Sequence, residues 1–224
     1  MNIFNRVTPI NIQPRSKLLM IGDSITDCGR SRWGSGVADG GLGDGYVSLV
    51  NGLLVATYPQ SQIRIINMGI SGNTVRDLKG RWKSDVLEHA PDWLSILIGI
   101  NDVWQHFESW WGSIRLVSVD DYAEILEDLI RQTRPHLDGL ILMTPYYLET
   151  DRTDPMRVMM DQFADVVRQL AEQYQAILVD TVAAFDEVLE HVDPPALAQD
   201  RVHLNLPGHM ILARAFLDAV GYSW

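Results

Sequence analysis

The stretch "KLLMIGDSITDCG" (residues 17–29) joins an apolar run to a segment of small and polar residues. The run has the length of a strand and no polar interruption after its lysine, which favours a strand that is buried in a sheet. It stops at Gly22, and Ser24 follows two residues later. The stretch therefore predicts a strand that ends at a serine, and this serine is either a nucleophile or an ordinary turn residue.

The same alternation of apolar runs and amphipathic stretches continues along the whole chain. Runs of strand length occupy residues 17–21, 63–67, 93–98, 139–144 and 176–180. Helical spacing occupies residues 46–58, 78–89, 120–134, 156–174 and 207–220. Ser118 and Asp121 resemble a capping box at the start of one of these helices. The pattern predicts an α/β fold, with a parallel sheet covered by helices on both faces.

The length and composition suit one compact domain that spans residues 1–224. The chain is 46% hydrophobic, which is enough to bury a sizeable core. Its formal net charge is -11, so it has no basic surface for neutralising phosphates. We therefore expect neither a nucleic-acid nor a membrane partner, and neutral or cationic small substrates fit the charge better.

The cysteine content and the N-terminal segment bear on location. Cys28 is the only cysteine, so an intrachain disulfide is excluded and nothing indicates an oxidising compartment. The first seventeen residues lack the apolar stretch of a signal peptide, and no later segment has the length of a membrane span. We expect a cytoplasmic protein.

The segment "DRVH" places Asp200 three residues before His203. In a turn, this spacing lets the carboxylate accept a hydrogen bond from the histidine Nδ1, which leaves Nε2 free to take a proton from a serine. Taken alone, the spacing favours an exposed loop pair over a catalytic pair, because Asp-x-x-His is common.

Two further segments could supply hydrogen-bond donors to a negatively charged oxygen in an acyl-transfer reaction. "NMGISGNT" (residues 67–74) offers the backbone amides of Gly69 and Gly72, and "GIND" (residues 99–102) offers the side-chain amide of Asn101. An ordinary glycine turn and an asparagine-aspartate helix cap are the alternatives for these two segments.

Together and in this order, "IGDSITD" (21–27), "NMGISGNT", "GIND" and "DRVH" resemble the four signature blocks of the GDSL or SGNH hydrolase family. The resemblance covers the chain from Lys17 to the C-terminus. It implies a serine esterase or lipase that needs no cofactor, on a three-layer α/β/α sandwich with a flavodoxin-like parallel sheet of about five strands.

Position by position, the resemblance also implies the roles of five residues. Ser24 would be the nucleophile, and its own backbone N–H would be one donor of the oxyanion hole. Gly72 would provide a second donor from its backbone N–H, and Asn101 a third from its side chain. His203 would be the general base, and Asp200 its orienting partner.

The longer forms "GDSITDCGR", "GISGNTVRDL", "IGINDVW" and "DRVHLNLPGHMILARAF" are similar to bacterial acetylxylan esterases. In the fourth signature block, the chain departs from the wider GDSL or SGNH family at Leu204, where many relatives have proline after the histidine. This similarity implies removal of acetyl groups from acetylated carbohydrate, with xylo-oligosaccharides as the substrate. The alternatives are a short-chain lipid ester or thioester hydrolase that uses the same site, and a catalytically idle carbohydrate-binding protein.

Aromatic residues gather around two insertions, residues 30–45 and 104–118, which follow predicted strand ends. Because a flat ring can stack on a sugar, we interpret Trp33, Trp104 and Tyr146 as candidate substrate-binding residues. Packing in the core or between subunits is the alternative, and the Trp110-Trp111 pair is compatible with a homo-oligomer.

The remaining polar residues near the four blocks are given structural roles. His209 with Asp200 could suggest a metal site, but no His-Glu-x-x-His motif or cysteine cluster accompanies them, so we predict no metal. We expect Asp23, Asp27 and Asp102 to hold turns through hydrogen bonds to the backbone. Cys28 is interpreted as a buried small residue, and Trp82 and Trp93 as core residues.

Overall fold

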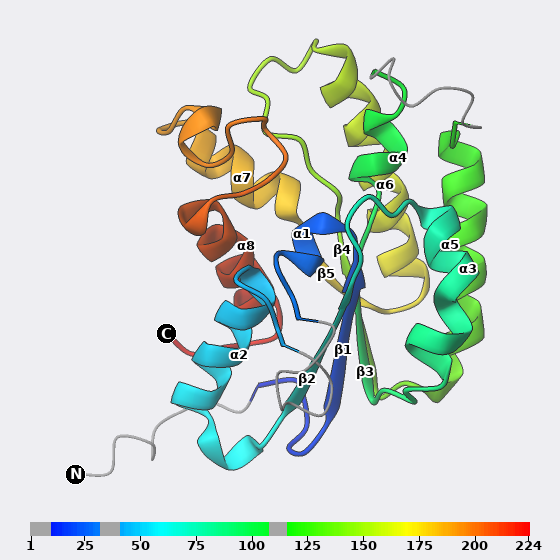
Figure 1. Ribbon diagram of the computed structural model, residues 1–224, viewed down its shortest axis with the longest axis vertical. Helices are drawn as coiled ribbons and strands as arrows, with labels where there is room; N and C mark the ends of the chain where they lie inside the picture. Colours follow the sequence, from blue (N-terminus) through cyan, green and yellow to red (C-terminus); the bar gives the residue numbers. More distant parts are fainter. Residues whose placement is uncertain (1–9, 32–40, 108–115) are drawn as a thin grey trace.

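The computed structural model describes residues 10–31, 41–107 and 116–224. At its centre is a five-stranded sheet in which every neighbouring pair is parallel, in the order β2-β1-β3-β4-β5 (Figure 1). The strands are β1 (Lys17–Gly22), β2 (Arg64–Gly69), β3 (Trp93–Leu97), β4 (Gly139–Met143) and β5 (Ile177–Val179). This is the strand order of flavodoxin-like sheets, as the sequence predicts.

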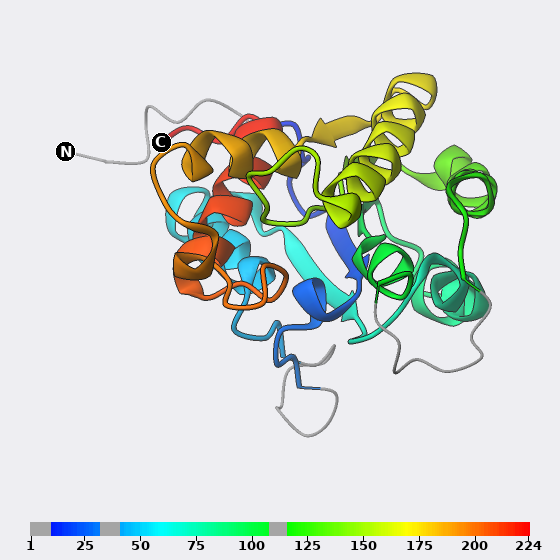
Figure 2. The ribbon, with the colours of Figure 1, turned by 90° about the horizontal axis from the view of Figure 1, so that it is seen from above.

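Helices cover both faces of the sheet, which confirms the three-layer α/β/α arrangement (Figures 1 and 2). One layer contains α2 (Tyr46–Thr57), α7 (Thr181–Leu189) and α8 (Leu206–Ala219), and α8 contacts both of the others. The other layer contains α3 (Val75–Trp82), α5 (Val119–Thr133) and α6 (Pro155–Gln173), with α5 packed between α3 and α6. None of the helices in the described part of the chain is long and apolar enough to cross a membrane.

The apolar runs of the sequence correspond to the middle of this sandwich. Every residue of β3 and β4 is buried, because helices cover both faces of these strands. The edge strands β2 and β5 include partly exposed positions. Trp82 and Trp93 both lie in the core, as predicted. A side chain at Gly139 would lie 2.3 Å from the Trp93 ring, so a glycine is needed opposite this tryptophan.

Within the described residues, the structure adds three α-helices that the sequence pattern did not predict. Two of them, α1 (Ser24–Asp27) and α4 (Ile100–Trp104), are single turns and too short to show a helical period. The third is α7, whose buried residues Val182, Phe185 and Leu189 follow the spacing of one helix face. That spacing was the signal that could have identified it.

The start of one helix differs from the expectation, and the cap of another agrees with it. The helix expected at residues 78–89 begins earlier, at Val75, because Thr74 and Asp77 form a reciprocal capping box. It continues beyond Trp82 as a π-helical segment, η2 (Lys83–Leu87). At the start of α5, Ser118 accepts the Asp121 N–H as expected, 3.1 Å away.

The strand order places three of the four sequence blocks at one edge of the sheet. The chain passes from β1 to β2 on one side, then crosses to β3 on the other side of β1. Ser24, Gly72 and Asn101 follow these three neighbouring strands, and the carboxyl ends of parallel strands meet at the same edge. The fold therefore brings the three residues together at the point where the strand order reverses.

Candidate active site

Ser24 is the first residue of α1 and comes directly after the end of β1. Asp23 caps this helix, because its Oδ1 accepts the Ile25 N–H at 3.0 Å. The turn between strand and helix is tight: a Cβ at Gly22 would lie 2.3 Å from the Leu97 carbonyl oxygen. The glycine is therefore required for Ser24 to reach the sheet edge.

Ser24, His203 and Asp200 form a continuous line of hydrogen bonds. Ser24 Oγ lies 3.0 Å from His203 Nε2, and His203 Nδ1 lies 2.7 Å from Asp200 Oδ2. Because the carboxylate can only accept, it holds the ring proton on Nδ1, and Nε2 is left to accept the serine proton. The "DRVH" spacing predicts this arrangement of the last two residues.

The Asp200 carboxylate is fixed by more than the histidine ring. Its Oδ1 also accepts the backbone N–H groups of Val202, at 3.0 Å, and of His203, at 2.8 Å. Burial acts to raise the pKa of Asp200, but these hydrogen bonds, led by that from the His203 ring, hold the pKa below its usual value. A negative Asp200 favours the imidazolium that forms when His203 takes up a proton.

A cavity of about 430 Å³ lies beside Ser24 and is also lined by Gly72, Asn101 and His203. Asn101 is 5% exposed, and its Nδ2 donates one hydrogen to the Asn73 carbonyl oxygen at 2.9 Å. An amide has a second hydrogen, which is left for a ligand. Neither the Ser24 N–H nor the Gly72 N–H donates to another group in the part of the chain that the structure describes.

Gly72 adopts a left-handed backbone conformation, with φ of +81°. Such a conformation disfavours other residues, so a glycine is required to turn the backbone here. Gly69, the other glycine of this segment, is the last residue of β2, and its N–H donates to Asn67 Oδ1 at 2.9 Å. Of the two candidate donors, only Gly72 therefore lines the cavity.

The buried carboxylates beside the blocks have the structural roles that the sequence indicates. Asp102 accepts the N–H of Val75, the first residue of α3, at 3.0 Å. Asp27 accepts the N–H and the hydroxyl of Ser71, each at 3.1 Å. Burial raises the pKa of Asp23, and likewise that of Asp102, to about 7.

Arg81 of α3 contacts the first two sequence blocks, although no motif singles it out. Its guanidinium donates to the carbonyl oxygens of Gly22 at 2.9 Å and Met68 at 2.8 Å, and to Asn73 Oδ1 at 2.7 Å. The Asn73 carbonyl in turn positions Asn101. One side chain of α3 thus connects the ends of β1 and β2 to the candidate oxyanion hole.

Cys28 and His209 also line the cavity, which the sequence reasoning missed. The Tyr46 N–H donates to His209 Nδ1 at 3.2 Å, so Nε2 carries the ring proton and faces Cys28 Sγ, also at 3.2 Å.

Burial lowers the pKa of His209 to about 4. Burial, together with the charges of Asp44 and Asp27, raises the pKa of the Cys28 thiol. The pair is therefore neutral at pH 7. The position of Cys28 about one helical turn after Ser24 was the signal that could have placed it beside the site.

Tyr146 does not line the cavity, so its prediction as a substrate-binding residue is wrong. The side chain is 1% exposed, and its hydroxyl donates to the Val202 carbonyl oxygen at 3.0 Å. The neighbouring Leu148 N–H donates to the Arg201 carbonyl oxygen, also at 3.0 Å. The loop after β4 thus holds the segment that carries Asp200 and His203.

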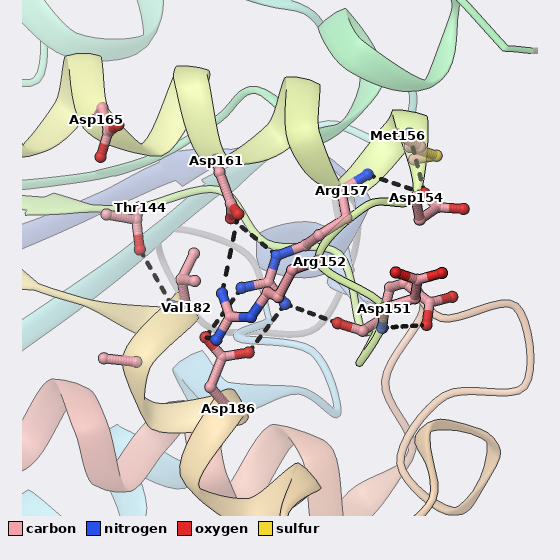
Figure 3. A network of polar contacts seen from close by, with 12 residues as sticks. Thr144, Asp151, Arg152, Asp154, Met156, Arg157, Asp161, Asp165, Val182 and Asp186 are labelled. Carbon is pink, nitrogen blue, oxygen red and sulfur yellow. Dashed lines mark hydrogen bonds and ion pairs between the residues drawn. The ribbon is translucent and has the colours of Figure 1, made fainter.

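A network of polar contacts holds that loop in turn (Figure 3). Arg157 of α6 is 1% exposed and donates to the Glu149 carbonyl oxygen at 2.7 Å. It also makes two hydrogen bonds of 2.9 Å to Asp186 of α7 and one of 2.8 Å to Asp161. The Glu149 side chain forms an ion pair with Arg201, next to Asp200. The network therefore connects two helices to the segment of the catalytic candidates.

Among the aromatic candidates, Trp104 lines the cavity, and its ring centroid is 5.8 Å from that of His203. Trp33, Trp110 and Trp111 lie outside the described residues. Within residues 10–31, 41–107 and 116–224, no group of three or more His, Cys, Asp or Glu side chains is placed to hold a metal ion.

Comparison with known proteins agrees with the four blocks. Residues 20–211 match the GDSL-like Lipase/Acylhydrolase family. An acetylxylan esterase of Geobacillus stearothermophilus is 54% identical over 93% of this chain and 95% of its own length. The crystal structure of Axe2, an acetylxylan esterase from the same organism, is 53% identical, with a TM-score of 0.91, over 96% of this chain and 98% of that chain. LAE5, an alpha/beta hydrolase enzyme from the metagenome of Lake Arreo, is 45% identical with a TM-score of 0.91, over 95% of this chain and 98% of that chain.

Proposed function

Since the chain belongs to the GDSL-like lipase/acylhydrolase family, we propose that it is a serine esterase that removes acetyl groups from acetylated xylo-oligosaccharides. The observation that carries the proposal is the hydrogen-bonded line from Ser24 through His203 to Asp200, beside a cavity lined by Gly72 and Asn101. A catalytically idle binding protein would have no use for a serine held 3.0 Å from a histidine nitrogen.

In the first half of the reaction, Ser24 Oγ attacks the carbonyl carbon of the acetyl group while His203 Nε2 takes the serine proton. The carbonyl oxygen becomes negative and accepts hydrogen bonds from the N–H groups of Ser24 and Gly72 and from Asn101 Nδ2. Collapse of this intermediate breaks the bond to the sugar oxygen. His203 gives its proton to that oxygen, so the sugar leaves as an alcohol.

In the second half, a water molecule attacks the acetyl group on Ser24, and His203 takes its proton. The new oxyanion is stabilised by the same three donors. When it collapses, the proton returns from His203 to Ser24 Oγ, and acetic acid leaves and ionises to acetate in water. Asp200 stays negative throughout and favours the protonated histidine of each intermediate.

Three observations favour a sugar ester over other esters. The 54% identical relative is named acetylxylan esterase. The net charge of -11 disfavours anionic substrates. An indole ring, that of Trp104, lies beside His203, where the leaving alcohol must be protonated. A lipid ester or thioester substrate remains the alternative that the experiment below separates.

The test is release of acetate from acetylated xylo-oligosaccharides, measured beside hydrolysis of 4-nitrophenyl acetate, with Ser24→Ala as the control. We expect both activities in the wild type and neither in the variant. Hydrolysis of the nitrophenyl ester alone would keep the serine mechanism and overturn the sugar substrate. No activity on either ester would overturn the esterase. The cytoplasmic location and a homo-oligomeric state stay predictions.

A further inference from the structure

A second cavity, of about 370 Å³, adjoins the candidate active site. It shares Trp104 with the first cavity and includes Asp200, the partner of His203. Its other lining residues come from the segment after α4, the loop after β4 and the start of α6: Phe107, Tyr147, Asp154, Pro155 and Met156. None of the four sequence blocks accounts for these five residues.

We propose that this second cavity is the subsite for the sugar that carries the acetyl group. The proposal rests on the proposed function and specifies which part of the substrate binds where. The ligand class is a neutral, hydroxylated pyranose chain that leaves as an alcohol. Phe107 and Tyr147 would be specificity-determining residues.

The chemistry of the reaction decides the side on which the sugar must lie. His203 has to protonate the leaving oxygen, so the sugar projects from the ester on the histidine side of the site. Trp104 packs beside the His203 ring, at 5.8 Å between centroids, and Asp200 holds that ring from behind. Trp104 and Asp200 both line the second cavity, so a sugar bonded to the reacting acetyl group extends toward this cavity.

The lining of this cavity suits the two kinds of surface that a sugar has. Trp104 and Tyr147 are half-buried, and Phe107 is 42% exposed, so three aromatic side chains are available to the C–H faces of a sugar ring. Asp154, Asp200 and the Tyr147 hydroxyl can accept hydrogen bonds from sugar hydroxyls. Aromatic faces with a few acceptors at the edge are expected of a carbohydrate subsite.

The charge of the cavity argues against other leaving groups. Two carboxylates, Asp154 and Asp200, line it. Arg201 forms an ion pair with Glu149, and its guanidinium also lies 3.5 Å from the Tyr147 hydroxyl. A phosphate-bearing thiol or a phospholipid headgroup would bring further negative charge beside these two carboxylates, whereas a neutral sugar would not.

The cavity wall is also held in place before a ligand binds. Asp154 caps α6, because its Oδ1 accepts the N–H groups of Met156 at 2.9 Å and Arg157 at 3.0 Å (Figure 3). Arg157 is itself fixed to α7 through Asp186. A preformed wall lowers the entropic cost of binding a flexible oligosaccharide.

The experiment compares two substrates that share the acetyl group and differ in the alcohol. Values of kcat/KM are measured on acetylated xylotriose and on 4-nitrophenyl acetate for the wild type, Phe107→Ala and Tyr147→Ala. The control is Val55→Ala, which removes a 56% exposed apolar side chain from α2. We expect each aromatic variant to lower the ratio of sugar ester to nitrophenyl ester about tenfold, mainly through KM, as the loss of one ring contact predicts.

A second measurement does not depend on removal of an acetyl group from a sugar. Deacetylated xylotriose should inhibit hydrolysis of 4-nitrophenyl acetate competitively, and about tenfold more weakly in Phe107→Ala. An unchanged ratio and unchanged inhibition in both aromatic variants would overturn the subsite and leave the proposed function intact. So would an equal fall of the ratio in Val55→Ala. A wild type that hydrolyses only the nitrophenyl ester would overturn the proposed function itself, and the subsite with it.

Discussion

The Tyr146 hydroxyl donates a hydrogen bond of 3.0 Å to the carbonyl oxygen of Val202. In the chain, Val202 lies between Asp200 and His203, two residues of the proposed triad. This contact joins the loop after β4 to the segment before α8. The two segments are 56 residues apart in the chain. The contact therefore ties the segment of His203 to a side chain that does not line the cavity beside Ser24.

Tyr146→Phe should lower both stability and kcat. The substitution keeps the buried ring but leaves the Val202 carbonyl oxygen without its donor, which costs on the order of 1–3 kcal/mol. We expect a lower denaturant midpoint and a lower kcat on 4-nitrophenyl acetate, with KM little changed. Chemical denaturation and steady-state kinetics measure the two effects.

The matched control is Tyr174→Phe, since the Tyr174 hydroxyl donates to Glu127 at 2.9 Å on the surface formed by α5 and α6. It should leave kcat unchanged. If Tyr146→Phe lost stability with an unchanged kcat, the contact would support folding only and would not position His203.

Asn101→Ala should lower kcat by roughly a hundred- to a thousandfold, the usual loss for one oxyanion donor. The remaining donors are the two backbone N–H groups, which the substitution does not touch. Hydrolysis of 4-nitrophenyl acetate is the readout, and Asn51→Ala, on α2, is the control. Activity within about threefold of the wild type would remove Asn101 from the oxyanion hole.

The strands and the chemical blocks were predictable because their signals are local. Buried parallel strands such as β3 and β4 are continuous apolar runs, which need no tertiary information to recognise. The hydrogen bond of Asp200 to His203 follows from a spacing of three residues in a turn. The resemblance to the family supplied the remaining assignments.

The missed features depend on contacts between distant parts of the chain. Tyr146 follows a strand end, as a pocket residue would, but its hydroxyl finds a buried carbonyl and the ring enters the core. His209 meets Cys28 across 181 residues, and Arg81 reaches Gly22 across 59. No periodicity or motif in the sequence indicates contacts between residues so far apart in the chain. The short helix α1 begins where Asp23 provides a cap, and it is too short to show a repeating pattern of apolar residues.

Arg157→Met should destabilise the fold by about 1–3 kcal/mol, because the buried Glu149 carbonyl oxygen loses its donor, whereas the Asp186 and Asp161 side chains, 23% and 33% exposed, stay in contact with water. Arg157 is 1% exposed, and both Asp186 and the Glu149 carbonyl oxygen would lose the hydrogen bonds that its guanidinium donates. Urea denaturation measures the loss. Arg131→Met removes a 67% exposed guanidinium from a surface pair and should cost less than about 1 kcal/mol. Similar losses in both variants would contradict the structural importance of the network.

Asp23→Asn should make stability less dependent on pH between about 4 and 7. Burial raises the pKa of Asp23 in the folded protein to about 7, above the ordinary value of about 3.9 for an unfolded aspartate. The folded state therefore binds the proton more tightly, so this contribution to stability is complete below pH 4 and is lost as the pH rises through 7. Each such carboxyl contributes a slope of up to about 1.4 kcal/mol per pH unit.

The comparison of pH slopes is made by urea denaturation of the wild type and the variant at several values between pH 4 and 7. The asparagine keeps an oxygen that can accept the Ile25 N–H, so the cap of α1 can persist. Because other groups titrate in both proteins, the difference between the two slopes is the quantity that isolates Asp23. Equal slopes would show that Asp23 does not take up a proton on folding in this range.

Ser24→Ala and His203→Ala should each abolish nearly all activity, and combining them should add little further loss. The two side chains act as one unit, since the histidine is useful only as the base for the serine 3.0 Å away. Residual hydrolysis by the double variant of 4-nitrophenyl acetate should therefore equal that of either single variant within about threefold. Losses that multiply would mean that Ser24 and His203 act in separate steps, and the hydrogen bond between them would then have no catalytic meaning.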